Sequence, residues 1–481
     1  MADPPPNDPL PGGPGAVEPS PPAPAETAPA DTAPAAWWAP GRLAGTAVRL
    51  LSSPAAPAAL LGAVTMASVG ARVFYLDQPC TASCKTGYDH ALIFDEKYYV
   101  NAARRIDGFA VQGGDPYSNV PAGADGNAEH PQLGKLFIAA GMKLFGNQPA
   151  GWRLASLIAG TLAILAMYWL IRSARGGPWL ALGGATLMAV DNLLLVHGRI
   201  ATLDIFVVVA MMAGVALYLR DQRIASGASL GVACCIKLVA PYAFLVLVII
   251  EALRVRRGSG GATPGWRPLL KTGAIRFGIC LGVAVGTYLL LLFVLDRTVP
   301  AYDPGAGVYY RNPFSHTQHM WNYAKDLTSP SGPTGIASYP WQWLLNQEPI
   351  NYFRVDTNVF SGGKQVGTFP VIFFQGAMNP FIIFLVLPGL ALALAAAWRH
   401  VEEYAIVGSA WCLGTFLPNV VQSGAFHRTS YLYYMVPVMP GVYMVVAELF
   451  RRLPRPATVG WACALGYGFQ TLYPFRTWSG H

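Results

Sequence analysis

Two adjacent acids, Asp95 and Glu96, stand out in a chain that carries few charges. Their segment has amphipathic spacing, in which Ile93, Tyr98 and Val100 can face lipid or protein. In a helix, neighbouring side chains point about 100° apart, so the two carboxylates cannot share one task with equal geometry. One could meet a substrate while the other holds a network. The alternative is a solvated helix start, where acids favour the positive end of the helix dipole.

Other charged residues occur where lipid or loops would make them costly. The segment from His130 to Lys135 reads H-P-Q-L-G-K, which as a plain loop would end in a snorkelling lysine. Asp204 follows Arg199 and lies one turn into an apolar run, and Lys237 lies inside another. Ionisable residues inside a membrane are usually paired or functional. A structural pair of Asp204 with Lys237 or with Arg199 is therefore the alternative to a binding role.

Aromatic residues mark a third group of candidates. Tyr339-Pro-Trp-Gln-Trp343 lies late in the chain, and the stretch from His427 contains Arg428 and Tyr433. Such aromatics first indicate an interfacial belt. Arg428 beside them could instead bind an anionic lipid head group. The letters G-x-S-x-G at 227–231 lie in a membrane run and do not indicate a hydrolase.

The composition indicates whether water or lipid surrounds the chain. Of 481 residues, 53% are hydrophobic and only 12% are charged, whereas soluble domains have about a quarter. Lipid must therefore face most of the chain. The net charge of +8 comes mostly from basic residues in short segments between apolar runs, a pattern typical of membrane topology signals and not of nucleic-acid binding.

We count about eleven apolar runs that could cross a bilayer, for which roughly 20 residues suffice. The runs are approximately 54–75, 152–172, 178–196, 200–219, 226–239, 240–253, 274–295, 371–397, 404–420, 431–449 and 456–473. The fifth and sixth are short and flank Pro241, so they could form one bent hairpin or a re-entrant pair.

Basic residues predict the orientation of these runs. Arg42 and Arg49 precede the first run, and the even-numbered runs are each followed by arginines. The positive-inside rule then places the N-terminus in the cytoplasm and two long loops, about 76–151 and 296–370, outside. Residues 1–40 are rich in Pro and Ala and are predicted to be a disordered tail. A membrane domain would span 41–481.

Cysteines add one expectation. The seven cysteines form no zinc signature, and Cys80 and Cys84 share a predicted outer loop. A disulfide between them is plausible outside the cytoplasm. The acidic, proline-rich start does not have the pattern of a cleavable signal peptide.

Together, these segments resemble the protein O-mannosyltransferase family of the C superfamily of membrane glycosyltransferases (GT-C, glycosyltransferase family 39). The chain carries similar segments in the family's order: Phe94-Asp95-Glu96, His130–Lys135, Arg199–Asp204, Tyr339–Trp343 and the aromatic stretch from His427. It departs from the pattern at Gln132, where a second proline is usual, and at Tyr433-Tyr434, where Tyr-His is usual. The MIR domain of the eukaryotic enzymes is absent, which resembles the bacterial members.

The resemblance implies an all-α GT-C fold, with amphipathic juxtamembrane helices in the outer loops. It implies a polyprenyl-phosphate-mannose donor and transfer to Ser/Thr hydroxyls of exported proteins at the outer face of the cell membrane, with the secretion translocon as a candidate partner. No cofactor or metal is expected. A lipid phosphate leaves without a strong acid but needs cationic or hydrogen-bonding groups, so Lys135, Arg199 and Arg428 are the candidates.

We expect Asp95 to be the base for the acceptor hydroxyl. Glu96 would then position the acceptor or pair with an arginine. His130, Asp204 and Tyr433 complete the expected substrate-binding residues, and a single displacement would invert the anomeric centre. Two alternatives stay open: a GT-C enzyme that modifies a lipid or cell-wall glycan, and a transporter, for which charged midplane residues would speak.

Overall fold

The computed structural model describes residues 52–80, 83–259, 265–400 and 402–476. From Pro54 onward they belong to one compact unit. The predicted tail, residues 1–40, and the signals Arg42 and Arg49 lie outside the described residues.

Helices form most of this unit, as the apolar runs predict. Those of the first half are α2 (Ala56–Val73), α3 (Glu96–Ile106), α4 (Leu133–Phe145), α5 (Pro149–Ser173), α6 (Pro178–Ala189), α7 (Asn192–His197), α8 (Asp204–Leu219), α9 (Arg223–Cys234) and α10 (Tyr242–Ser259). Those of the second half are α11 (Trp266–Thr298), α12 (Pro313–Asp326), α13 (Pro340–Trp343), α14 (Pro380–Ile383), α15 (Val386–Arg399), α16 (Glu403–Ala425), α17 (Met439–Arg451) and α18 (Arg455–Leu472). Short 3-10 turns occur at η1 (Gly87–Asp89) and η2 (Leu432–Met435).

Every predicted apolar run contains a helix, which supports a membrane protein. Among the residues that the structure describes, five helical segments are long and apolar enough to cross a bilayer: α2, α5, α11, α16 and the stretch Pro380–Arg399. Helices α6 and α8 are apolar but shorter. The figure of about eleven crossings stays a prediction. The fifth and sixth runs are the separate helices α9 and α10, and Lys237 and Pro241 lie in the turn between them.

Close backbone approach fixes α9 against α11. A Cβ added at Gly227 would lie 2.4 Å from the carbonyl oxygen of Cys280, and one at Gly231 would lie 2.6 Å from that of Ala284. Small residues four apart let membrane helices touch in this way. The two glycines of the G-x-S-x-G letters therefore serve helix packing.

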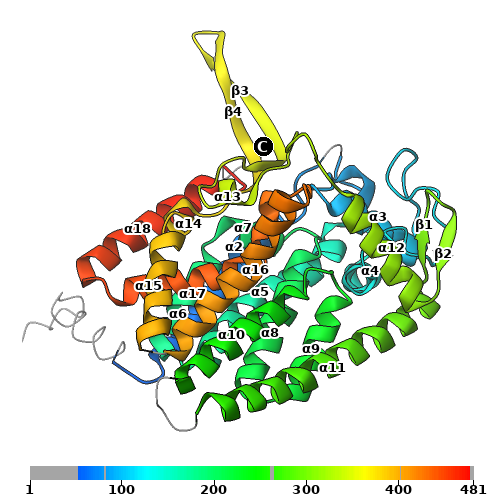
Figure 1. The fold of residues 1–481 in the computed structure, drawn as a ribbon. Coiled ribbons are helices and arrows are strands. Elements are labelled where there is room, and N and C mark those ends of the chain that lie inside the picture. The colour runs from blue at the N-terminus through cyan, green and yellow to red at the C-terminus, as the bar shows by residue number, and fades with distance from the viewer. Residues whose placement is uncertain (1–51, 81–82, 260–264, 401, 477–481) are drawn as a thin grey trace, which may run out of the picture. The chain divides into compact units, whose positions relative to one another are not determined.

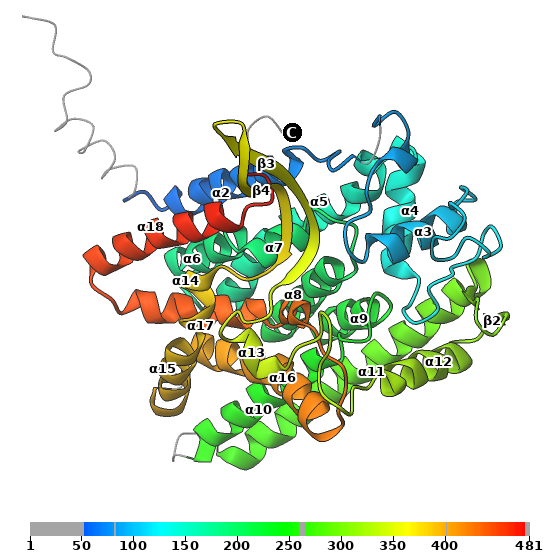
Figure 2. The ribbon, with the colours of Figure 1, turned by 90° about the horizontal axis from the view of Figure 1, so that it is seen from above.

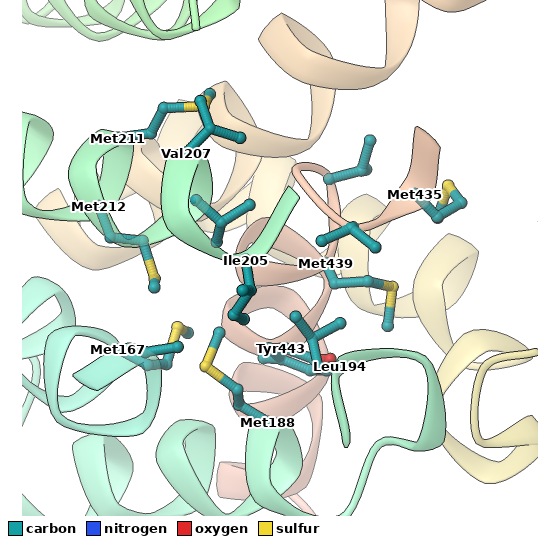
Figure 3. Close-up of a cluster of buried hydrophobic side chains, with 14 of the residues drawn as sticks. Met167, Met188, Leu194, Ile205, Val207, Met211, Met212, Met435, Met439 and Tyr443 are labelled. Atoms are coloured by element: carbon teal, nitrogen blue, oxygen red, sulfur yellow. The ribbon is translucent and has the colours of Figure 1, made fainter. Parts of the chain in front are cut away.

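The core lies where α5, α6, α7, α8 and α17 meet. Figure 3 shows methionines and aliphatic side chains from these helices converging, among them Met188, Leu194, Ile205 and Met439, all fully buried. Unbranched methionines fill irregular gaps between helices. Leu194 and Ile205 flank the segment 197–204, so this packing holds that segment in place.

The two long loops are folded. The first contains α3 and α4, and Figures 1 and 2 place both near α12 of the second loop, away from α15 and α18. The amphipathic helix was predicted over 91–105, and helix α3 begins later, at Glu96. Cys80 and Cys84 form the expected disulfide.

The second loop departs from the all-α expectation. It contains a small antiparallel sheet of β1 (Ala301–Asp303) and β2 (Val308–Tyr310), and a long hairpin of β3 (Ile350–Ser361) and β4 (Lys364–Gly376). The predicted apolar run 371–397 therefore begins inside β4, not in a helix. The first residues of that run are β-branched or aromatic, which favours a strand.

Candidate active site

A cavity of about 660 Å³ is lined by both long loops and by residues of α8, α10 and α16. Its lining includes five of the predicted site residues: Asp95, His130, Asp204, Arg428 and Tyr433. The other three, Glu96, Lys135 and Arg199, are buried and do not line it.

The Asp95 carboxylate is available to a ligand. Asp95 occupies the N-cap position of α3 without capping it through its side chain. Among the described residues, no side chain forms an ion pair or hydrogen bond with this carboxylate. The preceding residue, Phe94, has a φ of +55° and stacks on Tyr352 with ring centroids 4.1 Å apart. A bulky residue in this conformation is strained, and the stacking contact holds it there.

The surroundings of Asp95 tune its protonation. Burial raises the pKa of Asp95 to about 7, the nearby Lys237 opposes the rise and Asp204 adds to it. Burial disfavours the charged carboxylate, and the two neighbouring charges act in opposite senses. A carboxylate with a pKa near 7 is suited to proton transfer at neutral pH.

Glu96 points away from the cavity into a closed network. Its two oxygens accept from Arg153, with Nε–Oε1 at 2.9 Å and Nη2–Oε2 at 2.8 Å. They also accept from the backbone N–H groups of Ile93 (2.8 Å) and Ala201 (2.9 Å). Of the two roles expected for Glu96, the structure contains the arginine pair. Glu96 is fully buried and does not line this cavity, and its bonds fix the start of α3.

The placement of Lys135 and Arg199 differs from the expected phosphate sites. The Lys135 ammonium contacts Asp125 Oδ2 at 2.5 Å and donates to the carbonyls of Asn127 (2.5 Å) and His130 (2.8 Å). These contacts use the three donors of an ammonium.

Arg199 is likewise committed elsewhere. It donates to the carbonyls of Phe74 and Tyr75, both at 3.0 Å, and lies over the ring of Phe475 at 4.9 Å. Since neither cation lines the cavity, both hold loops together instead.

Lys237 is the cation that the sequence-based site list lacks. It lines the cavity, donates to Asp204 Oδ1 at 2.7 Å and lies 5.3 Å from the centre of the Tyr433 ring. The expected Asp204–Lys237 pair is thus present. Behind it, His197 Nε2 is 3.0 Å from Tyr352 Oη. The intramembrane position of Lys237 was the signal that could have placed it in the site.

Arg428 lies between α16 and the η2 turn. Its guanidinium donates to the carbonyl of Ala324, and its backbone N–H donates to the Gln422 carbonyl at 3.0 Å. Tyr433 stacks on Tyr431 with centroids 5.6 Å apart. Tyr434, where the family pattern has histidine, also lines the cavity. Arg428 and Lys237 give the cavity positive charge from two different connections between helices.

The loop before α4 adds neutral and acidic groups. Burial lowers the pKa of His130 well below its usual value, and Lys237, Lys135 and Arg428 lower it further. His130 is therefore a neutral hydrogen-bonding group at physiological pH, not a cation. Its neighbour Glu129 also lines the cavity, accepts from Asn127 Nδ2 at 2.7 Å and has a pKa raised by burial. No sequence signal pointed to Glu129.

Several named proteins are similar to this chain in sequence. Residues 129–258 match the family model of the dolichyl-phosphate-mannose-protein mannosyltransferases. A polyprenol-phosphate-mannose–protein mannosyltransferase of Mycolicibacterium smegmatis is 23% identical over 80% of this chain and 84% of that protein. One of Corynebacterium glutamicum is 25% identical over 74% of this chain and 76% of that protein.

The chain is thus similar in sequence to protein mannosyltransferases over most of its length. Its fold is also similar to theirs: the Saccharomyces cerevisiae Pmt1–Pmt2 complex, solved with its sugar donor, has a TM-score of 0.63. The match has 11% identity and covers 90% of this chain and 91% of the yeast chain. The fold is therefore the helical GT-C fold, and it contains a hairpin that composition does not predict.

Proposed function

We propose that this protein transfers mannose from a polyprenyl-phosphate carrier to Ser/Thr hydroxyls of proteins. One observation carries the proposal: a single cavity contains an unpaired carboxylate, Asp95, together with two cations, Lys237 and Arg428. A transfer from a lipid phosphate needs both, a base for the acceptor and positive charge for the leaving group. The names of the relatives support mannose and a protein acceptor.

In the reaction that we propose, the acceptor hydroxyl gives its proton to Asp95 as its oxygen attacks the anomeric carbon. The bond from that carbon to the phosphate oxygen breaks, and the polyprenyl phosphate leaves with the electron pair. A single displacement of this kind inverts the anomeric configuration. Glu96, locked to Arg153, keeps the adjacent carboxylate turned toward the cavity.

The donor phosphate would lie against Lys237 and Arg428. The Lys237 ammonium uses one of its donors on Asp204 and faces the cavity, so other donors can reach a phosphate oxygen. Arg428 can present a planar guanidinium, which suits phosphate. His130, as a neutral group, would bond a sugar hydroxyl or the phosphate ester oxygen.

We further propose the expected location. The arginines between the apolar runs place the N-terminus in the cytoplasm and the cavity at the outer face of the cell membrane. Acceptors would then be exported proteins, met during or after passage through the translocon. Transfer would need no added metal or cofactor beyond the lipid-linked donor.

The test uses the purified full-length protein in lipid vesicles with polyprenyl-phosphate-[14C]mannose. We expect label to move to a Ser/Thr-containing polypeptide, not to a glycolipid, and to do so after EDTA treatment. Asp95→Asn should lower kcat by about 100- to 10,000-fold, the range of a lost general base, with donor binding kept. Label appearing on the glycolipid alone, or full turnover by the variant, would contradict the proposal.

A further inference from the structure

The β3–β4 hairpin extends beyond the helices that carry the cavity (Figure 1). Its strands pair from Ile350 with Gly376 to Ser361 with Lys364, and its turn is formed by two glycines with positive φ. From Arg354 to the turn the side chains are exposed, and they include the apolar Val355, Val359 and Phe360. An isolated two-stranded hairpin is marginally stable in water.

The two edges of the hairpin differ. At its base, the outer edge of β4 is already bonded to residues near the C-terminus: Phe373 N–H donates to the Pro474 carbonyl at 2.7 Å, and Arg476 N–H donates to Val371 O at 2.9 Å. The next residue of β4 toward the turn is Pro370, which has no N–H to donate. The outer edge of β3 has no backbone partner among the described residues. Of the two strands of the hairpin, only β3 therefore presents a row of N–H and C=O groups that is free along its whole described outer edge.

The pairing of β3 with β4 shifts register at three points, and the extra residue lies on β3 only at the first of them, Tyr352. Beyond Tyr352, the free edge of β3 lacks the features that usually block strand addition. Natural edge strands are protected by proline, by inward charges or by covering segments. The sequence of β3 has no proline, and its charges Arg354 and Asp356 bond to each other at 2.8 Å. Nothing in the side chains prevents another extended chain from pairing here.

The same strand leads into the cavity. Tyr352 of β3 lines it, stacks on Phe94 beside Asp95, and contacts His197. A chain bound along β3 would thus arrive next to the proposed base. From Tyr352 to Ser361 the edge measures about 30 Å, at roughly 3.3 Å per residue.

We propose that the outer edge of β3 binds the acceptor polypeptide as an added strand and delivers its Ser/Thr to Asp95. This proposal rests on the proposed function, in which the acceptor is a protein, and it adds the surface that binds this acceptor. In strand addition the main-chain hydrogen bonds supply the affinity, so many sequences can bind. Continuity with the cavity favours the acceptor over a second copy of the chain as occupant.

Acceptor length provides the test. Peptides with one threonine and about 5 or about 20 residues are compared, since only the longer can reach along the edge. We expect the KM of the wild type to be at least about tenfold lower for the longer peptide, because it adds several main-chain hydrogen bonds. N-methylation of its backbone away from the threonine should remove that advantage.

Two variants distinguish binding along the β3 edge from effects of the fold or of apolar side chains near the turn. Replacing residues 358–368 by Asn-Gly shortens the hairpin beyond the Thr357–Phe369 pair. This variant should keep the kcat and KM for the short peptide, which reports an intact fold, and lose the length dependence. The matched control Phe360→Ser keeps the edge and removes the largest apolar side chain near the turn, so its length dependence should remain.

Other results would overturn the proposal. If the shortened variant keeps the length dependence, the edge does not bind the acceptor. If light scattering shows a dimer for the wild type and a monomer for the shortened variant, while the length dependence is unchanged, the edge pairs two copies of the chain. If the wild type modifies both peptides with one KM, docking fails while the proposed function stands. Failure to modify any peptide would overturn both.

Discussion

Two buried lysine–aspartate pairs in this protein have similar chemistry and different surroundings. Lys135 and Asp125 are completely buried, and the remaining donors of the ammonium go to backbone carbonyls. Lys237 and Asp204 are bonded at 2.7 Å, but both line the cavity. We call the first the closed pair and the second the open pair.

The comparison teaches that burial of a charge does not by itself identify its role. A closed pair has satisfied its hydrogen bonds and fixes the loop that carries His130. An open pair has donors left for a ligand and holds them where the cavity is hollow. Free hydrogen-bond donors that face a cavity therefore indicate a ligand-binding role better than burial of the charge does.

Breaking the closed pair should have the largest effect on stability. In Lys135→Met, Asp125 is left as an unpaired buried carboxylate, which costs about 3–5 kcal/mol. Thermal unfolding in detergent should show a large fall in Tm. Lys271→Met is the control, because Lys271 is exposed on α11 and has no ion pair among the described residues. Equal Tm values for the two variants would contradict the closed-pair interpretation.

Breaking the open pair should affect catalysis more than stability. Lys237→Met removes a cation that we place at the leaving phosphate, so kcat/KM should fall about 100-fold, or about 2.7 kcal/mol. Lys237→Arg should recover part of the loss, since the charge returns. Steady-state transfer assays check this, with Tm measured alongside. A fall in Tm as large as that of Lys135→Met, with kcat/KM little changed, would mean that both pairs are structural.

The pH dependence is the subtlest distinction between the pairs. The base must be unprotonated, and Asp95 has a pKa of about 7, so kcat/KM should rise with pH and level off above about 7. Lys237 lowers this pKa, hence Lys237→Met should move the midpoint to higher pH. Lys135→Met should leave it unchanged. A midpoint near 4 in the wild type would show that another group limits the rate.

Much of the fold was predictable because lipid imposes a simple constraint. Long apolar runs must become helices, and each run from 54–75 to 456–473 contains one. The β3–β4 hairpin was missed since hydropathy alone does not separate a strand from a helix. Gly362-Gly363 between alternating residues was the available hairpin signal, and Val371 to Phe374 were counted as the start of a span.

The site was predictable to the level of segments but not of individual cations. Asp95, His130, Asp204, Arg428 and Tyr433 line the cavity, as residues of the recognised segments could. Lys135 and Arg199 belong to the same segments and point elsewhere, because backbone carbonyls bind them, near in sequence for Lys135 and distant for Arg199. Hydrogen bonds to carbonyls leave no trace in the side-chain pattern of a sequence. Lys237 was left out of the predicted site although its position in an apolar run was a signal, and no sequence signal pointed to Glu129.

The Glu96 network has a consequence for biogenesis. Its bonds join the start of α3, Arg153 on α5 and the backbone at Ala201, segments that leave the ribosome at different times. The carboxylate of Asp95 acquires its orientation only when all three have met. The proposed base would therefore become able to act only late in assembly. A chain inserted only as far as α5 would contain Asp95 but not the Ala201 contact that completes the Glu96 network.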